Sequence, residues 1–184
     1  LLHFEHCSWA LNLGIDVICE KPLTLMSDQL NVLEDLEKKN GVRVWSILQL
    51  RHHESIVKLK EKHSSLSRTK LEVDLTYVTP RNEAYLKTWK GNKKKSGGIL
   101  FNIGLHFFDM LIHIFGDVKS YEVHHNEPHV LSGIINFKNV TVRWFLSILD
   151  KHSPYYQKRD NMTYRSITFN GKELDFSSGF DELH

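Results

Sequence analysis

The stretch Gly14 to Pro22, GIDVICEKP, decides the fold class of this 184-residue chain. Its core, Ile15 to Cys19, is short, almost entirely apolar and rich in β-branched residues, which is typical of a strand buried on both faces of a parallel sheet. Helices are predicted on either side of it, from His3 to Gly14 and from Ser27 to Lys39, and a second apolar strand follows from Val42 to Leu50. The order helix–strand–helix–strand predicts a doubly wound α/β unit.

The pattern changes near residue 50, where we place a boundary between two domains, residues 1–50 and 51–184. From Leu71 to Tyr77 apolar and polar residues alternate strictly, which indicates a strand with one buried face. Helices are predicted over His53–Leu66 and Ile99–Phe115, and a long loop over Pro80–Gly98. Further strands are predicted at Val118–His125, Val130–Phe137, Val140–Ile148, Tyr164–Phe169 and, after a hairpin turn at Asn170-Gly171, Glu173–Phe176. The second domain is therefore α+β, with an open and mostly antiparallel sheet.

An open sheet has two faces, and the predicted helices can cover only one of them. Tyr77, Trp144, Phe145 and Phe169 give the strands more large apolar groups than one face requires. We therefore expect the second face to bury against another copy of the chain, giving a dimer or tetramer. The alternative is that further parts of the chain cover it.

The composition excludes several classes of protein. Lys and Arg number 24 against 22 Asp and Glu, so a net charge of +2 gives no general case for nucleic-acid binding. Cys7 and Cys19 form no CxxC pair, which argues against a disulfide framework and favours a reducing compartment, the cytoplasm. No apolar stretch approaches the roughly 20 residues of a membrane helix, so we expect no membrane partner. Because the sequence opens on Leu1 without Met, we expect a fragment of a longer protein.

The first candidate site is Glu20-Lys21-Pro22, at the carboxyl end of the predicted buried strand. In open α/β sheets, ligands bind outside the carboxyl ends of the strands. The ammonium group of Lys21 could donate a hydrogen bond to a substrate hydroxyl and stabilise the alkoxide as a proton leaves. The alternative is a surface lysine at a strand end, paired with Glu20.

The second candidate site lies on the predicted helix that follows Gly97-Gly98. Asn102, His106, Asp109 and His113 fall at offsets of 0, 4, 7 and 11 residues, so they form a polar stripe on one face. Such a histidine can serve general acid–base catalysis. Two alternatives remain, a metal site and an Asp–His hydrogen bond that only orients the ring.

Two basic segments complete the candidates. Arg51 follows the second strand, again at a carboxyl end, and could bind an anionic group through two hydrogen bonds. The segment Lys87 to Lys95 has Tyr85 and Trp89 beside its lysines, so it could bind phosphates or stack a base. The alternative for both is a solvated loop. The sequence contains neither GxGxxG nor GxxxxGK[ST].

Two of these motifs together carry a family resemblance. GIDVICEKPLTL at Gly14–Leu25, followed by SGGILFNIGLHFFDMLIHIFG at Ser96–Gly116, resembles the Gfo/Idh/MocA family of NAD(P)-dependent sugar oxidoreductases. The resemblance implies the α/β end of a Rossmann domain over residues 1–50, followed by a substrate and oligomerisation domain with an open antiparallel sheet.

A closer resemblance is to the bacterial UDP-N-acetylglucosaminuronate 3-dehydrogenases. It rests on the segments SILQLRHHESIVKLK, VDLTYVTPRN, WKGNKKKSGGILFNIGLHFFDML and VRWFLSI, which begin at Ser46, Val73, Trp89 and Val142. The resemblance implies NAD-dependent oxidation of the C3 hydroxyl of a UDP-linked uronic acid, for lipopolysaccharide O-antigen biosynthesis. Many family members have aspartate at the position of Asn102, and the asparagine fits this subgroup.

The resemblance also assigns roles. Lys21 corresponds to the catalytic lysine and His106 to the catalytic histidine, which would act as general base with an ordinary pKa of about 6.5. Together with charge and position it places four residues at the substrate and three at the cofactor: Asn102, Arg51, Asp109 and Lys95, and Glu20, Lys21 and His3. No metal is expected.

The sequence departs from the family pattern at the cofactor. The glycine fingerprint for the pyrophosphate and the acidic residue for the adenosine ribose do not occur in these 184 residues, so NAD is not distinguished from NADP. We therefore expect the chain alone to be inactive. The alternatives are a non-enzymatic dimerisation or sugar-binding module and a sibling dehydrogenase of different sugar specificity.

Overall fold

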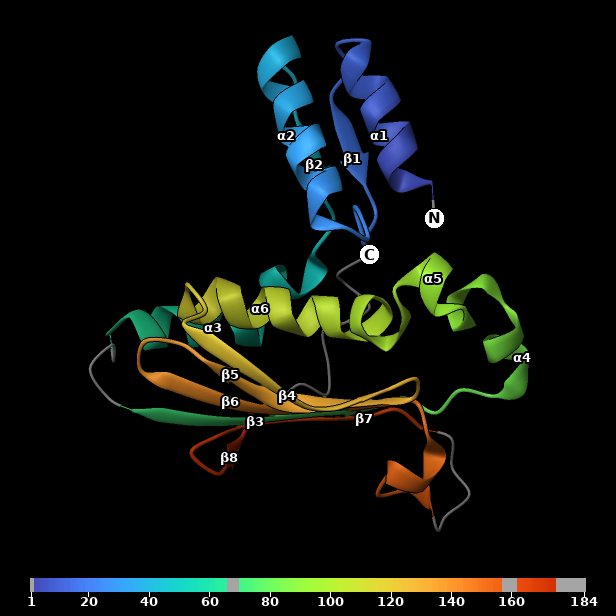
Figure 1. Ribbon diagram of the computed structural model, residues 1–184. Helices are drawn as coiled ribbons and strands as arrows, with labels where there is room; N and C mark the ends of the chain where they lie inside the picture. Colours follow the sequence, from blue (N-terminus) through green and yellow to red (C-terminus); the bar gives the residue numbers. More distant parts are fainter. Residues whose placement is uncertain (1, 66–69, 157–161, 175–184) are drawn as a thin grey trace.

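The computed structural model describes residues 2–65, 70–156 and 162–174 of the chain. A small α/β unit stands on a larger unit in which helices lie over one face of a sheet (Figure 1). The small unit contains helices α1 (His3–Asn12) and α2 (Ser27–Asn40) and strands β1 (Val17–Cys19) and β2 (Val44–Ser46). Strand β1 pairs with β2 in parallel, with Val17 opposite Val44, as the sequence predicts.

Both helices of the small unit contribute to one core, made by Cys7, Leu11, Cys19, Leu33 and Val42. Burial raises the pKa of the Cys19 thiol to about 12, which keeps it protonated and unreactive. The outward residues Ile18 and Trp45, which pair across the two strands, are 75% and 51% exposed. Within the described residues, therefore, only one face of β1 is covered.

The larger unit begins with the 3₁₀ turn η1 (Gln49–His52) and helix α3 (Glu54–Ser65). Its sheet has the order β4-β5-β6-β3-β7-β8, and only β3 and β6 pair in parallel, which confirms the mostly antiparallel open sheet. The strands are β3 (Leu71–Val78), β4 (Ser120–Glu127), β5 (Val130–Asn136), β6 (Val140–Ser147), β7 (Tyr164–Phe169) and β8 (Lys172–Glu173), with a 3₁₀ turn η4 (Asp150–His152) after β6.

One segment of this unit differs from expectation, and one predicted turn is present. The segment Pro80–Gly98 is not a plain loop, because it contains α4 (Glu83–Lys87), η2 (Trp89–Gly91) and α5 (Lys93–Ser96). Asn82 and Asn92 cap α4 and α5, respectively, through their side-chain oxygens. At the other end, Asn170 and Gly171 both have positive φ (48° and 77°), as the predicted hairpin requires. Part of the expected strand Glu173–Phe176 lies outside the described residues.

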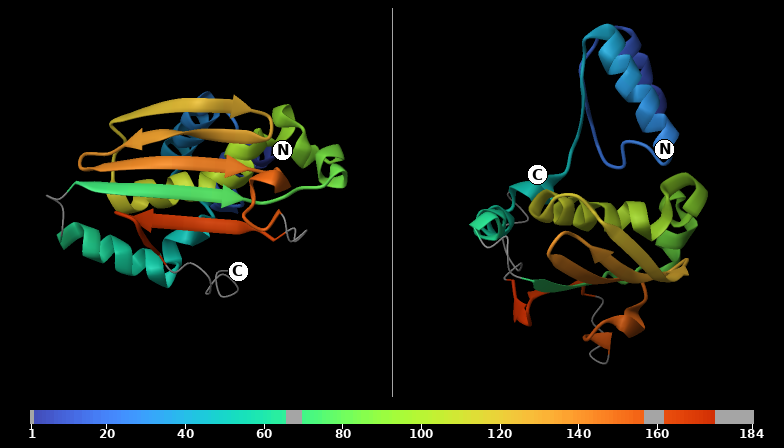
Figure 2. Two further views of the ribbon diagram at one scale, coloured as in Figure 1. Left: turned by 90° about the horizontal axis from the view of Figure 1, so that it is seen from below. Right: turned by 60° about the vertical axis from the view of Figure 1, so that its left-hand side comes forward.

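Helices α6 (Leu105–Phe115) and α3 lie over one face of the sheet (Figures 1 and 2). The helical segment Lys93–Phe115 is long and apolar enough to cross a membrane, by length and composition alone. The sequence gives no clear signal for this segment, because lysines and glycines interrupt its first turns. Phe107, Met110 and Leu111 are buried in the core shared with the sheet, which is the position of a core helix.

The face of the sheet away from the helices carries charged side chains beside apolar ones such as Ile134, which is paired with Arg143. Tyr77 packs against Phe107 and Trp144 against Phe108, with ring centroids 4.9 and 5.2 Å apart, so both point toward α6. Arg143 lies on the outer face, where it donates hydrogen bonds to carboxylates of β3. Phe169 also lies on the helix side, opposite Val73, so the expected surplus of apolar groups on the outer face is wrong. Of the four residues from which it was inferred, only Phe145 is there.

Candidate active site

The two sequence motifs meet at a hydrogen bond. Lys21, two residues after β1, donates from Nζ to the backbone oxygen of Asn102, which is 81 residues away in the sequence, at 2.6 Å. His3 lies on the other side of this turn, because its Nδ1 is 2.8 Å from the backbone oxygen of Pro22. The structure therefore brings Lys21 to the helix that carries Asn102 and His106.

The ammonium group of Lys21 is partly withdrawn from water. Burial lowers its pKa, the carboxylate of Glu20 opposes this, and the positive charge of Lys90 lowers it further. A lysine with a lowered pKa gives up its proton more readily than a surface lysine does. This environment favours the functional interpretation over a surface lysine at a strand end.

Asn102 lies in a π-helical turn, η3 (Leu100–Gly104), which continues directly into α6. Single π turns are rare and occur frequently at functional sites. The backbone oxygen of Asn102 accepts from Lys21, while its side-chain Nδ2 donates to the backbone oxygen of Lys90 at 3.1 Å. The sequence predicted a helix from Ile99 but gave no signal for its irregular first turn.

His106 is half-buried one turn further along. Its Nδ1 atom is buried and has no hydrogen-bond partner among the described residues. Burial lowers the pKa of the ring to about 4, the charge of Lys21 lowers it, and Asp109 opposes both. The expectation of an ordinary pKa near 6.5 is therefore wrong, because a charged ring would carry a buried N–H without an acceptor. His106 is in its neutral, proton-accepting form throughout the neutral pH range.

Arg51 and Asp109, both expected at the substrate, bind each other. Arg51 donates from Nε to Oδ2 of Asp109 at 2.7 Å and from its second terminal nitrogen to Oδ1. This pairing raises the pKa of Arg51, and the Asp109 side chain is only 11% exposed against 40% for Arg51. The pair joins η1 to α6, so both groups already have a partner. Asp109 also lacks the hydrogen bond to His106 that one alternative required.

His113, the last residue of the polar stripe, lies away from this centre. Lys60 Nζ is 3.2 Å from its Nε2 atom. No group of three or more His, Cys, Asp or Glu side chains suited to a metal ion occurs in the part of the chain that the structure describes. The geometry therefore gives the metal alternative no support.

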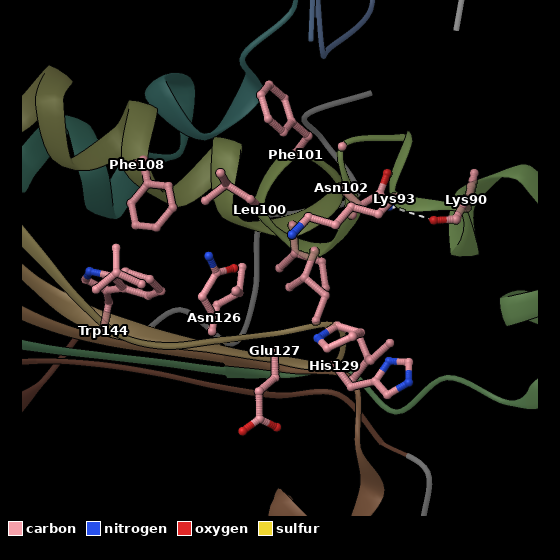
Figure 3. A pocket seen from close by; sticks show the side chains of 18 of the residues that line it. Lys90, Lys93, Leu100, Phe101, Asn102, Phe108, Asn126, Glu127, His129 and Trp144 are labelled. Atoms are coloured by element: carbon pink, nitrogen blue, oxygen red, sulfur yellow. Dashed lines mark hydrogen bonds between the residues drawn. The ribbon is translucent and has the colours of Figure 1, made fainter. Parts of the chain in front are cut away.

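A cavity of about 620 Å³ lies next to Asn102, between η3 and strands β4 and β5 (Figure 3). Asn102 lines it, together with Lys90 and Lys93 from the basic segment. Lys95, the lysine selected from the sequence, is exposed and is not among the lining residues. Lys93 was hidden in the sequence among three consecutive lysines, and only the direction of α5 separates them.

The described residues fit one end of a dinucleotide. His3, Glu20 and Lys21 surround the carboxyl end of β1, where ligands of open α/β sheets bind, and Glu20 is exposed there. The backbone cradle for the pyrophosphate of a dinucleotide has no counterpart among the described residues.

Comparisons with known proteins agree with this arrangement. Residues 1–48 match the Gfo/Idh/MocA description "Oxidoreductase family, NAD-binding Rossmann fold", and residues 69–176 match "Oxidoreductase family, C-terminal alpha/beta domain". Among curated proteins, oxidoreductase P35 of Formosa agariphila is 28% identical over 151 residues. That alignment covers 74% of this chain and 46% of P35, so the chain spans under half of this relative's length.

Solved structures give a closer match. The WlbA (WbpB) dehydrogenase of Thermus thermophilus, crystallised with NAD and alpha-ketoglutarate, is 43% identical with a TM-score of 0.90. The match covers all of this chain and 59% of that one. The WlbA dehydrogenase of Bordetella pertussis shares the fold at 19% identity, with a TM-score of 0.75 over 91% of this chain and 48% of that chain. With both of its segments matched, this chain belongs to the Gfo/Idh/MocA family of oxidoreductases.

Proposed function

We propose that the protein containing this chain is an NAD-dependent dehydrogenase that oxidises the C3 hydroxyl of a UDP-linked, N-acetylated uronic acid. The observation that carries the proposal is the contact of Lys21 with Asn102, which brings the lysine to the helix of His106. A second crystal structure of the T. thermophilus dehydrogenase, 42% identical over the whole chain, contains NAD and UDP-GlcNAcA.

The two candidate catalytic side chains divide the chemistry of alcohol oxidation between them. Lys21 donates a hydrogen bond to the hydroxyl oxygen and stabilises its developing negative charge. His106, neutral at physiological pH, accepts the hydroxyl proton. NAD supplies the hydride acceptor when it is bound, with His3 and Glu20 beside its nicotinamide end.

The substrate side follows from the polar groups of the same region. Asn102 lines the cavity, and we expect it to contact the sugar. Lys95 does not line the cavity, and we expect its charge to attract the diphosphate from a distance. Arg51 is proposed to donate a hydrogen bond to the uronate carboxylate, while Asp109, which binds Arg51, orients the guanidinium group from α6. Such a product suits lipopolysaccharide O-antigen synthesis, and self-association through the outer sheet face remains part of the proposal.

The test uses the full reading frame that contains this chain, assayed for NADH formation with a panel of UDP-sugars. Lys21→Ala and His106→Ala are expected to reduce the rate at least about a hundredfold, the usual contribution of a positioned acid–base group. His124→Ala, an exposed histidine on β4, is the matched control and should keep its activity. Retention of most activity by both site variants would overturn the role assignment. Preference for a sugar other than the N-acetylated uronate would establish the sibling specificity instead.

A further inference from the structure

The cavity beside Asn102 has walls suited to a flat ring. Its volume of about 620 Å³ lies within the range of small-molecule sites, about 300–1,000 Å³. Phe108 and Trp144 line one side, and Tyr121, which is 72% exposed on the edge strand β4, lines another. Aromatic side chains of this kind stack on nucleic-acid bases with little dependence on sequence.

The mouth of the cavity is positively charged. Lys90 and Lys93 line it, and the Lys93 ammonium group extends over the cavity toward Asn126 (Figure 3). Lys93 has no ion-pair partner among residues 2–65, 70–156 and 162–174. Glu127 is also on the rim, but its carboxylate points away from the opening (Figure 3). The cavity thus combines an apolar, aromatic interior with an unpaired cation at its entrance.

Asn102 connects the cavity to Lys21, although neither Lys21 nor His106 lines it. Asn102 lines the cavity, and its backbone oxygen accepts the hydrogen bond from Lys21. The backbone oxygen of Lys90 accepts a hydrogen bond from the Asn102 side chain, and the charge of the Lys90 side chain lowers the pKa of Lys21. A ligand that fills the cavity and passes between Lys90 and Lys93 therefore has its other end beside Lys21.

We propose that this cavity binds the nucleoside diphosphate end of the substrate, with the base against the aromatic walls and the diphosphate between Lys90 and Lys93. The inference rests on the proposed function, because it places the sugar at Lys21 and His106. An uncharged apolar ligand would exclude water from the Lys93 ammonium group without neutralising its charge, and this costs free energy. A nucleoside diphosphate supplies both the planar ring and the negative charge.

The first test measures binding of UDP to the full-length protein by calorimetry. Lys93→Ala removes one charge-assisted hydrogen bond and should weaken UDP binding at least about tenfold. Lys94→Ala is the matched control, because this neighbouring lysine of α5 is exposed and does not line the cavity. Uridine, which has no phosphate, should bind both variants as it binds the wild type. Equal UDP affinities of the Lys93 and Lys94 variants would overturn the assignment.

A second variant tests the aromatic wall. Tyr121→Ala changes an exposed side chain, so the fold should tolerate it, and it should weaken UDP and uridine alike. Unchanged binding of both ligands would exclude the base from this cavity.

Steady-state kinetics separates this inference from the proposed function. Lys93→Ala should raise KM for the UDP-sugar about tenfold with little change in kcat, because the phosphates lie away from the reacting carbon. Wild-type activity with an unchanged KM in this variant would refute the cavity assignment alone. A wild type that oxidises no UDP-sugar but binds UDP in a Lys93-dependent manner would refute the dehydrogenase and support the cavity.

Discussion

The buried ring of His106 makes the stability of the chain depend on pH in a predictable direction. Its pKa is about 4 in the folded chain, against an ordinary value of 6.5. Below about pH 6.5 the unfolded chain takes up a proton on this ring, whereas the folded chain does so only near pH 4. The free energy of unfolding is therefore unaffected above pH 6.5 and falls as the pH decreases toward 4. At about 1.4 kcal/mol per pH unit, the loss approaches about 3 kcal/mol.

The measurement is urea-induced unfolding of the wild type and of His106→Asn, each near pH 7.5 and near pH 4.5. Between these two values His106 should account for a loss of about 2.5 kcal/mol that the variant does not show. Lys94→Ala removes an exposed side chain of α5 and serves as the control, because its loss of stability on acidification should match that of the wild type. If His106→Asn loses as much stability on acidification as the wild type, the ring does not have the environment described here.

The same environment has a consequence for catalysis. A base with a pKa of about 4 is always unprotonated near neutral pH but accepts a proton weakly. An anionic uronate bound beside the ring would raise the pKa of His106, because a nearby negative charge favours the imidazolium. NMR titration of the ring with and without the UDP-uronate should show this increase, and an unchanged pKa would contradict the proposed position of the carboxylate.

Two further predictions concern stability, measured by the same urea unfolding. Arg51→Ala leaves the largely buried Asp109 without its partner and should destabilise the fold by about 1–3 kcal/mol, and Arg51→Ala combined with Asp109→Ala should recover part of this loss. An undiminished stability of Arg51→Ala would show that the pair does not hold α6. Gly133→Ala on β5 would place a Cβ atom 2.0 Å from the backbone oxygen of Glu122, so it should cost more than about 2 kcal/mol, whereas Ser132→Ala should cost less. Equal stabilities of the last two variants would contradict this close approach of β4 to β5.

The sequence could predict the site where a motif and a strand end coincide. Lys21 follows a short apolar strand, and His106 lies on a helix after two glycines, so each position is readable locally. The contact between the two motifs cannot be read locally, because the Lys21–Asn102 hydrogen bond joins residues that are 81 positions apart. It also depends on a π turn that has no sequence signal. The Arg51–Asp109 ion pair could not be predicted for the same reason, because the sequence around each residue does not show that the two side chains bind each other.

Strand alternation alone assigns most of the large aromatic side chains to one face of the sheet. Tyr77 belongs to the same alternating set as Leu71, so it had to point to the buried side of β3. Trp144 and Phe145 are adjacent in one strand, so they had to point to opposite faces. Only Phe169 required the register of β7 against β3, which pairs it with Val73 and which no local pattern reveals.

The charged side chains of the outer face change what kind of contact could form there. Arg143 is hydrogen-bonded to Asp74 and Glu72, so these charges are already paired within one chain. A second copy seated on this face would have to keep those pairs solvated or share them, since removing one partner from a buried ion pair is strongly unfavourable. Self-association through the outer face would therefore resemble a polar, hydrogen-bonded contact around Phe145 rather than the closing of an apolar core. Among the described residues, large apolar side chains such as Ile18, Trp45 and Tyr121 are exposed away from this face.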